Sequence, residues 1–383
     1  MADVTIGIKT PVHIGTGQMY GLGEYLIRTA KTSGFSYLLR IDQTKLFHAL
    51  SEKGRDNLIN AIGDRDFCLG DIIEAEKLDI NAIIHYKVLC GAKSNNPQDI
   101  REAVRTNGAP YIPGSSLKGA IRTAFLWKFA REDPRFIRVV MEESRDRLNK
   151  KWFGSAYANG IFDYEGKGKP NPQTDIFKFL QVSDFMPVRE NILDLVEVNT
   201  YSQNRAGYMA PKSFTIFAEA IRTGSKLKGS IAITPQMVAA LNSGSRRKIE
   251  ERFEAIGLES AISGGDISVP IRKTLAEFSR WALQKEEILA GKLQPGFQKP
   301  FNSVADQVRT CEMARIGFGV GTLYQTLIGL VEDKDPELAA DIISRMKLGK
   351  YPRSAQLGVL EPPYPKTLEL TAGNQPLGWI GWE

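Results

Sequence analysis

Residues 111–122, which read Tyr-Ile-Pro-Gly-Ser-Ser-Leu-Lys-Gly-Ala-Ile-Arg, constrain the fold of this chain more than any other segment. Pro113 ends a short β-type run, and the glycine after it permits a sharp turn of the backbone. Apolar residues then recur at helical spacing over 117–129, and Ser115 or Ser116 can cap the helix that this spacing predicts. The segment therefore predicts a strand, a tight corner and an amphipathic helix in succession.

The first two turns of this predicted helix carry hydroxyl and cationic side chains. A helix N-terminus presents unpaired N–H groups and a partial positive charge. Ser115 and Ser116, together with Lys118 and Arg122 on one face of the helix, add donors for phosphate oxygens. We expect the segment to bind a polyanion. The alternative is an ordinary capped amphipathic helix whose Lys and Arg face water.

The composition is that of a folded protein without export or membrane signals. A chain of 383 residues with 42% hydrophobic content can bury a large core, and its length favours about two domains. The net charge of +6 favours an anionic partner only where it is clustered. The N-terminus lacks a signal-peptide pattern, and no run reaches the roughly 18 apolar residues of a membrane span. We expect a cytoplasmic protein that does not bind membranes.

The three cysteines, Cys68, Cys90 and Cys311, show no C-x-x-C spacing and have no histidine nearby in a ligand pattern. This spacing supports neither a zinc site nor a disulfide framework. The histidines, His13, His48 and His85, are scattered along the chain. No Walker, H-E-x-x-H or G-x-S-x-G motif is present, so we predict no catalytic residue, metal or cofactor.

The periodicity of the chain predicts an α+β fold. In the first half we expect strands over 4–14, 37–41 and 80–89, helices over 44–61, 117–129 and 136–148, and a long loop over 154–175. In the second half we expect strands over 177–183, 356–360 and 367–370, a hairpin of 214–221 with 227–233, and helices over 245–255, 275–290 and 322–331. We predict two units, residues 1–175 and 176–383.

Two further segments are rich in glycine. Residues 11–17 read Pro-Val-His-Ile-Gly-Thr-Gly, and Gly15 and Gly17 permit close approach of another backbone, although a β-turn explains them equally well. Residues 317–322 read Gly-Phe-Gly-Val-Gly-Thr. The third glycine of the dinucleotide fingerprint is missing there, and no βαβ context surrounds the loop, so a Rossmann site is disfavoured.

The glycines at 317, 319 and 321 have two interpretations that remain open. They let the backbone pass close to an RNA backbone, with Arg315 just upstream, or they form a tight loop that packing requires. A polar segment from Tyr201 to Arg205, followed by Tyr208 and Lys212, is predicted to be an interaction loop. Its aromatic rings can stack on bases while its cations hold phosphates.

The sequences of the three motifs resemble those of a known protein family. A Pro-Gly-Ser-Ser-Leu/Ile-Lys-Gly-x-Ile/Leu-Arg segment that opens a helix resembles the signature of the RAMP superfamily, the RNA-binding subunits of CRISPR effector complexes. Residues 11–17 resemble the first strand and Gly-rich turn of that family, and 317–322 resemble its Gly-rich loop. Within the family, the late position of this loop and the closing Pro-Leu-Gly-Trp at 376–379 resemble the terminal subunit of type III-A (Csm) complexes.

The resemblance implies two ferredoxin-like or RRM-like units and a non-catalytic scaffold that caps the backbone filament at the 3′ end of the guide RNA (crRNA). The partners that it implies are crRNA, the backbone RAMP subunit, a small helical subunit and a host ribonuclease that trims the 3′ end. The RNA-binding residues that we predict are Gly15, Gly17, Ser115, Ser116, Lys118, Arg122, Arg205, Lys212, Arg315, Gly317, Gly319 and Gly321. The alternatives are a RAMP endoribonuclease that processes precursor crRNA, and a structural subunit that hardly touches RNA.

Overall fold

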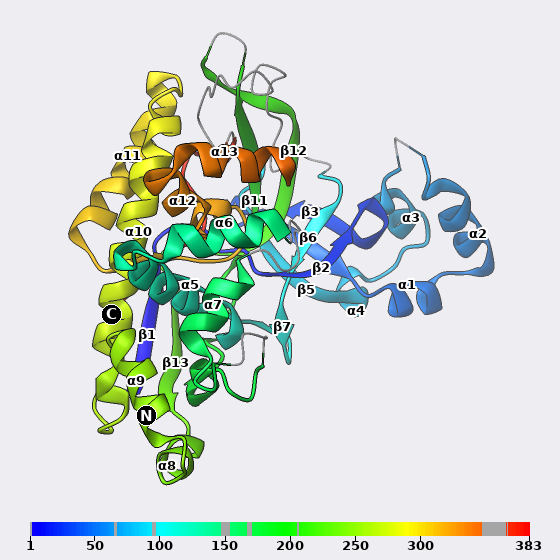
Figure 1. Cartoon of the computed structure of the whole chain (residues 1–383). Coiled ribbons are helices and arrows are strands. Elements are labelled where there is room, and N and C mark those ends of the chain that lie inside the picture. Colours follow the sequence, from blue (N-terminus) through cyan, green and yellow to red (C-terminus); the bar gives the residue numbers. More distant parts are fainter. Residues whose placement is uncertain are drawn as a thin grey trace.

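The computed structural model describes residues 2–64, 67–93, 97–146, 154–166, 171–204, 207–346, 365 and 367–383. In these residues two main β-sheets are covered by helices, and a small lobe of helices extends to one side (Figure 1). The predicted α+β class is therefore confirmed. The three cysteines form no disulfide with one another. Within the described ranges, no helix combines the length and apolar character that crossing a membrane requires.

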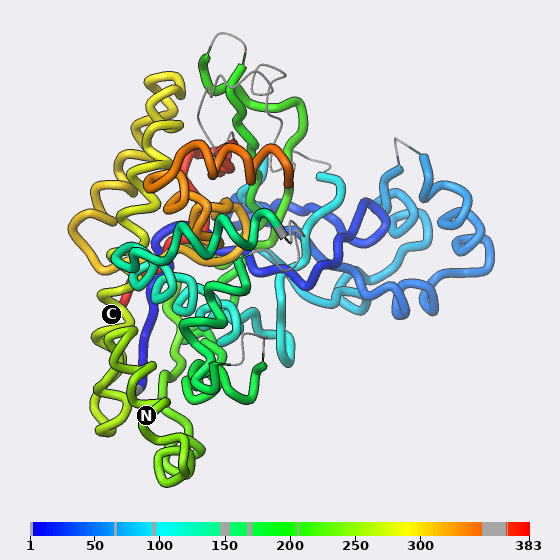
Figure 2. The backbone as a smooth tube through the Cα atoms, in the orientation of Figure 1, coloured from blue at the N-terminus to red at the C-terminus, as the bar shows by residue number. Residues whose placement is uncertain are grey.

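The first sheet has six strands among the described residues. They are β10 (Met186–Pro187), β13 (Lys226–Ile233), β1 (Ala2–Ile8), β16 (Trp379–Trp382) and β14 (Met313–Arg315) in spatial order, with β9 (Leu180–Val182) also paired to β13. The pairing of β1 with β16 brings the two ends of the chain to the same side of the molecule (Figure 2). This sheet is antiparallel at every pair of strands that it contains in the described residues.

The second sheet has eight strands in the part of the chain that the structure describes. They are β2 (Gly15–Tyr20), β6 (Ile100–Ala103), β12 (Met209–Ile221), β11 (Leu193–Gln203), β5 (Ile84–Cys90), β4 (Ser36–Ile41) and β3 (Tyr25–Thr29) in spatial order, with β15 (Thr367–Thr371) also paired to β11. Strands β7 (Arg105–Thr106) and β8 (Ala109–Pro110) form a separate short ribbon. The sheet is mixed, because β11 pairs parallel to β5 and β12 pairs parallel to β6.

The sheets combine strands from both ends of the sequence. In the first, β1 lies between β13 and β16, and in the second, β2 to β6 join β11, β12 and β15. The predicted division between residues 175 and 176 thus does not coincide with the division between the sheets. Two ferredoxin-like or RRM-like units with these bounds stay a prediction.

The helices form two groups. Helices α1 (Gln43–Ala49), α2 (Glu52–Ala61), α3 (Leu69–Ala75) and α4 (Ile80–Ile83) make up the lobe at the right of Figure 1. The others are α5 (Gly114–Glu132), α6 (Phe136–Asp146), α7 (Ser155–Phe162), α8 (Gln236–Leu241), α9 (Arg246–Ala255), α10 (Ser268–Ala290), α11 (Pro295–Thr310), α12 (Ile328–Lys334) and α13 (Pro336–Arg345). The lobe has its own apolar cluster, which includes Leu46, Leu58 and Ile73.

Helix α5 confirms the strongest element that the sequence predicts. Of its predicted apolar positions, Leu117, Ile121, Ala124 and Phe125 are fully buried in the largest apolar cluster of the described residues, and Phe129 is half-buried against that cluster. The other long helix of this region, α10, packs against it. Truncating one of these buried side chains to Ala would cost about 2 to 5 kcal/mol of stability, because the surrounding side chains fill a cavity only in part.

The predicted hairpin of 214–221 with 227–233 is wrong. Strand β12 pairs with β11 in the second sheet, whereas β13 pairs with β1 in the first. Residues 222–225 form a tight turn, but this turn carries the chain between sheets: the Gly224 amide donates to the Ile8 carbonyl at 2.8 Å. Turn residues mark a change of direction, and they do not specify which strand becomes the partner.

The predicted long loop over 154–175 is also wrong in part, because α7 occupies its first half. Tyr157, Ile161 and Phe162 of this helix are buried, at the spacing of one helix face. The glycines and prolines that follow conceal this pattern in the sequence. Tertiary burial of the apolar face overrides the weak helix propensity of the segment.

Several predicted boundaries shift. The helix expected over 44–61 is two helices, because the Ser51 hydroxyl caps α2 by accepting a hydrogen bond from Gly54 N at 3.0 Å. The strand expected over 4–14 ends at Ile8, and the segments 80–89, 177–183 and 322–331 each begin with a helical turn before the next element. The strand expected over 356–360 lies outside the described residues.

Candidate nucleic-acid interface

The corner before α5 is fixed by packing and by a carboxylate. The Gly114 amide donates to Asp184 Oδ1 at 2.8 Å, and a Cβ atom on Gly114 would lie 2.1 Å from the Val182 carbonyl oxygen. Only glycine fits this approach to β9. The N-cap of the helix is Pro113, without a side-chain cap bond, so the predicted serine cap is wrong. The serines at 115 and 116 lie inside the first turn, exposed and half-buried respectively.

The two cations of the signature segment contact the protein itself. Lys118 Nζ donates to the Leu180 carbonyl at 2.6 Å, and burial lowers the pKa of this ammonium, an effect that Asp175 partly offsets. Arg122 pairs with Asp175 at 2.7 Å, and its guanidinium lies 4.2 Å from the centre of the Phe162 ring. Both side chains are half-buried. They tie α5 to the segment that leads into β9.

The two glycine-rich motifs, far apart in sequence, meet in the structure. The Phe318 amide donates to the His13 carbonyl at 2.8 Å, and a Cβ atom on Gly317 would lie 2.5 Å from the same oxygen. Gly317 has a φ of +88°, a conformation that L side chains rarely adopt. We call residues 13–19, Arg101 and 317–321 together the glycine junction.

The glycine junction has an open edge. Residues 15–19 are all exposed, and β2 lies at the end of the second sheet as far as the described residues show. Gly17 has a φ of +88°, and a Cβ atom there would meet nothing within 4 Å. Next to this edge, the Arg101 guanidinium lies 4.5 Å from the centre of the Phe318 ring. A cation on an aromatic ring beside an exposed backbone is a surface suited to a phosphate backbone.

A buried carboxylate holds the strands behind this edge. Glu219 is fully buried on β12, where Oε1 accepts from the hydroxyls of Tyr20 and Tyr86 at 2.8 and 2.9 Å. Oε2 accepts from the Ala103 amide at 2.9 Å and from Arg105 at 3.1 Å. Burial, and then the charge of Glu219, raise the pKa of both tyrosines. Glu219 is not among the residues predicted from the sequence, although a lone carboxylate in the run Phe-Ala-Glu-Ala-Ile at 217–221 is a recognisable signal.

The prediction that Arg315 contacts RNA needs correction, because its side chain is fully buried. It donates to Glu286 Oε2 at 2.5 Å, to the Leu377 carbonyl at 2.7 Å and to the Gly319 carbonyl at 3.2 Å. Gly319 itself has a φ of +78°, and a Cβ atom there would lie 3.3 Å from Glu369 Oε2. Arg315 therefore fixes the conformation of the glycine loop from inside.

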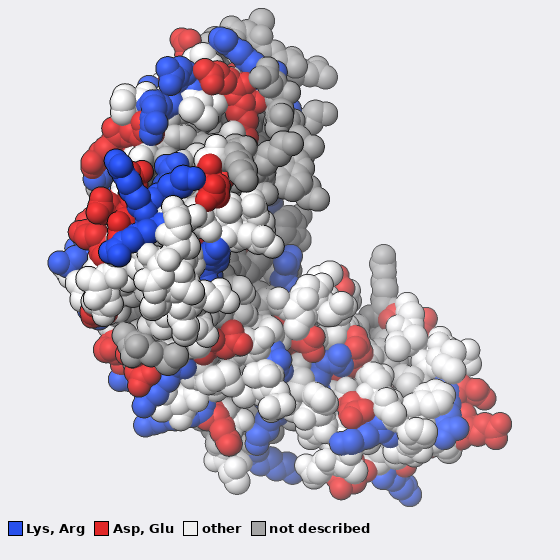
Figure 3. All heavy atoms as spheres, turned by 60° about the horizontal axis from the view of Figure 1, so that its bottom comes forward, with Lys and Arg blue, Asp and Glu red and all other residues white. Residues whose placement is uncertain are grey.

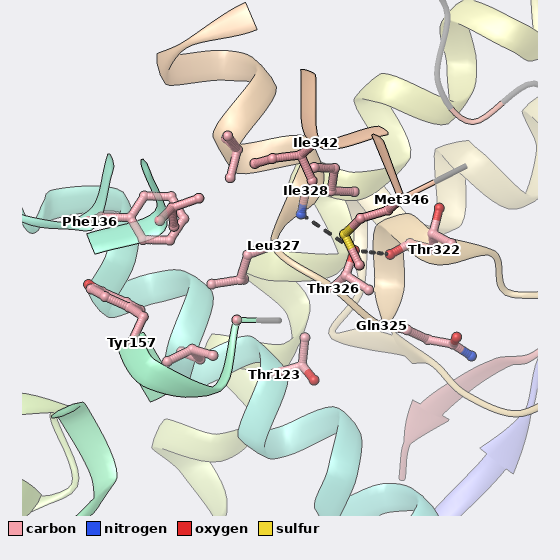
Figure 4. A pocket seen from close by; sticks show the side chains of 14 residues that line it. Thr123, Phe136, Tyr157, Thr322, Gln325, Thr326, Leu327, Ile328, Ile342 and Met346 are labelled. Atoms are coloured by element: carbon pink, nitrogen blue, oxygen red, sulfur yellow. Dashed lines mark hydrogen bonds between the residues drawn. The ribbon is translucent and has the colours of Figure 1, made fainter. Parts of the chain in front are cut away.

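A cavity of about 340 Å³ joins the signature helix to the end of the glycine loop (Figure 4). Thr123 of α5 lines it together with Thr322 and Gln325, which also line a smaller cavity of about 250 Å³ beside residues 317–321. Its remaining walls are mostly apolar, with Phe136 and Leu327 among them. All three sequence motifs thus belong to one region of the molecule.

The predicted interaction loop is the turn between β11 and β12. Tyr208 is 67% exposed there, and Phe214 further along β12 is 49% exposed with Lys212 Nζ at 5.7 Å from its ring centre. Tyr201, by contrast, is buried and donates to Asn374 Oδ1 at 2.9 Å. Arg205 lies outside the described residues. The RNA contacts that we predict for Lys212 and Arg205 stay predictions.

Charge is distributed rather than gathered on the face that Figure 3 presents, where Lys and Arg are interspersed with Asp and Glu. The three histidines lie on separate elements: His13 precedes β2, His48 is in α1 and His85 is in β5. Across the described ranges, no group of three or more His, Cys, Asp or Glu side chains could hold a metal ion.

Comparisons with known proteins agree with the motifs. The RAMP superfamily matches residues 5–290 of this chain. The CRISPR system Cms protein Csm5 of Methanocaldococcus jannaschii is 24% identical over 48% of this chain and 42% of that protein. The protein of the same name from Streptococcus thermophilus is 28% identical over 58% of this chain and 61% of that protein. The chain thus matches about half the length of these curated relatives.

Solved structures show the same fold over the whole chain. A chain of the cryo-EM structure of a Csm-crRNA-target RNA ternary complex, from a type III-A CRISPR-Cas system, has a TM-score of 0.74 at 23% identity, with both chains fully covered. The crystal structure of T. onnurineus Csm5 has a TM-score of 0.64 at 21% identity, and covers 98% of this chain and 99% of that one.

Proposed function

Since this chain belongs to the RAMP superfamily, we propose that it is an RNA-binding subunit of a type III-A CRISPR effector complex. Three facts support the proposal: the shared fold with a chain of a Csm-crRNA-target RNA complex, the relatives named Csm5, and the three motifs that lie in one region. The observation that carries it is the glycine junction, where an exposed strand edge lies beside a cation stacked on an aromatic ring.

In this proposal the chain caps the filament of backbone subunits at the 3′ end of the crRNA. It contacts the last backbone subunit and a small helical subunit, and it supports trimming of the 3′ end by a host ribonuclease. The exposed residues of the glycine junction, the aromatic residues of the β11–β12 hairpin and the exposed face of α5 at Ser115 and Gly119 contact the RNA. Lys118 and Arg122 position α5, since each already has a partner in the protein.

We propose further that the chain does not cut RNA itself. Metal-independent cleavage needs a general acid and a general base that converge on one 2′-hydroxyl. His13 is buried, its Nδ1 lies 2.7 Å from the Glu219 carbonyl oxygen, and burial lowers its pKa. The other candidate function, an endoribonuclease that processes precursor crRNA, would require a general acid and a general base, and the sequence motifs indicate neither.

Salt-dependent RNA binding tests the proposal. The isolated chain should bind a fluorescently labelled 20-nucleotide single-stranded RNA, with an affinity that falls as salt rises because bound phosphates release counterions. Arg101→Gln should lower the slope of log affinity against log salt by about 0.7, the value of one lost contact to a single strand. The matched control is Arg247→Gln, which also removes one charge from a side chain that is 91% exposed on α9.

An equal loss of slope in both variants would show that only net charge matters, and the glycine junction would then not be the RNA site. Absence of RNA binding by the wild-type chain and by its complex would favour the purely structural subunit. The same preparations should leave the RNA intact with and without divalent metal. Cleavage that is proportional to enzyme and is lost in His13→Ala would favour the endoribonuclease.

A further inference from the structure

A small cavity lies where β4, β5 and the start of β11 meet the residue that follows β12. Its volume is about 160 Å³, and its lining residues are Tyr37, Lys87, Leu89, Asn191, Leu193 and Arg222. The Tyr86 hydroxyl reaches Glu219 on the inner face, so Lys87, the next residue along β5, points to the other side. No carboxylate belongs to the lining.

Arg222 is held in this cavity with a donor to spare. Its amide donates to the Ile192 carbonyl at 2.8 Å, and its Nη2 donates to the Asn191 carbonyl at 2.5 Å. Asn191 adopts a left-handed backbone conformation, with φ at +55°, to present that oxygen. The Nε atom of Arg222 is buried and has no hydrogen-bond acceptor among the described residues. A buried donor without an acceptor costs stability, and an anion bound there would recover it.

Lys87 supplies a second cation. Its Nζ lies 5.7 Å from the centre of the Tyr37 ring, and its side chain is exposed, with no ion pair to a described carboxylate. One carboxylate whose charge interacts with Arg222 is Asp194, whose Oδ1 already accepts from the Gly91 amide at 2.8 Å, and Glu190 lines the adjoining cavity together with Arg222. Burial raises the pKa of Asp194, an effect that the Gly91 amide and the charge of Arg222 partly offset.

We propose that this cavity binds one phosphate group, held by the guanidinium of Arg222 and the ammonium of Lys87. A planar guanidinium fixed by one protein acceptor and free at Nε is suited to a tetrahedral oxyanion, and a mobile ammonium completes the charge balance. The phosphate can belong to the RNA backbone or to a free nucleotide. The first source deepens the function proposed above and rests on it, whereas the second does not.

Two probes distinguish these sources. Calorimetric titration with inorganic pyrophosphate measures a free phosphate ligand, and fluorescence anisotropy with the labelled single-stranded RNA, over a salt series, measures the backbone. The variants are Lys87→Gln and Arg222→Gln, and the control is again Arg247→Gln. Because Lys87 is exposed, its variant should fold normally even if loss of the Asn191 contact destabilises Arg222→Gln.

If the cavity holds an RNA phosphate, each cavity variant should lower the salt slope for RNA by about 0.7, and the control should not. If it holds a free phosphate, pyrophosphate should bind the wild-type chain and at least tenfold more weakly to both variants, with the RNA slope unchanged. Unchanged behaviour of Lys87→Gln toward both probes would overturn the proposal. If the cavity variants lower the salt slope of RNA binding and Arg101→Gln does not, the glycine junction is not an RNA site, and the proposal for this cavity still holds.

Discussion

Replacing Gly119 by Ala is expected to stabilise the protein and to weaken RNA binding at the same time. Gly119 lies in the second turn of α5, is exposed, and a Cβ atom there would meet nothing within 4 Å. Glycine inside a helix costs about 0.8 to 1.0 kcal/mol relative to Ala, since it loses more backbone freedom on folding. Nothing in the described structure offsets that gain, so the variant should be more stable by nearly this amount.

The expected rise in melting temperature is small but measurable. An unfolding entropy of about 2.1 cal/mol/K per residue means that a gain of 0.8 kcal/mol shifts the melting temperature of a chain of this length by about 1 °C. Urea unfolding resolves the same gain as a change in midpoint at constant slope. If RNA passes over this face of α5, the added methyl group occupies the path, and RNA affinity should fall although stability has risen.

Gly160 provides a matched control, because it lies in α7 and a Cβ atom there also meets nothing within 4 Å. Gly160→Ala should give the same gain in stability with unchanged RNA affinity. A lower melting temperature for Gly119→Ala would refute the helix argument. Higher stability with unchanged RNA affinity would refute the assignment of this face of α5 to RNA.

Three further substitutions test the structural roles of polar groups. Arg122→Ala should destabilise the fold by roughly 1 to 2 kcal/mol in urea unfolding, because it breaks the ion pair with Asp175 and the ring contact, and unchanged stability would contradict this role. Arg315→Met should cost about 3 to 5 kcal/mol by leaving Glu286 buried and unpaired, and normal thermal stability would exclude the buried pair. Burial lowers the pKa of His13, so stability should fall as pH drops below the ordinary histidine value of 6.5, where only the unfolded chain gains a proton. His13→Gln should remove that part of the pH dependence, and an unaltered profile would contradict it.

The sequence predicts the signature helix well because α5 is long and its buried residues Leu117, Ile121 and Ala124 recur at helical spacing. Rules based on neighbouring residues fail where a strand pairs with a segment that is distant in the sequence. The turn at 222–225 is real, yet its two strands enter different sheets, because β12 pairs with β11 and β13 pairs with β1. Short elements such as α7 depend on tertiary burial more than on propensity.

In the candidate site, too, local sequence features were predictable and contacts between distant residues were not. The glycine-rich motifs identified the segments that meet at the glycine junction. A backbone position at positive φ favours glycine, so such positions can be recognised in the sequence. It could not reveal that Lys118, Arg122 and Arg315 already have protein partners, since Leu180, Asp175 and Glu286 lie far from them along the chain. Cations in a motif indicate an anion, and only the fold shows whether that anion is a carboxylate of the same chain.

Recovery of RNA with the assembled complex tests the central claim most directly. The full chain, tagged and purified from its native cells under conditions that keep the complex intact, should carry guide RNAs together with a backbone RAMP subunit. The Arg101→Gln variant should retain the protein partner and carry less of that RNA than the Arg247→Gln control. Recovery of the partner subunits with no RNA above an untagged control would contradict the proposal that this chain is an RNA-binding subunit.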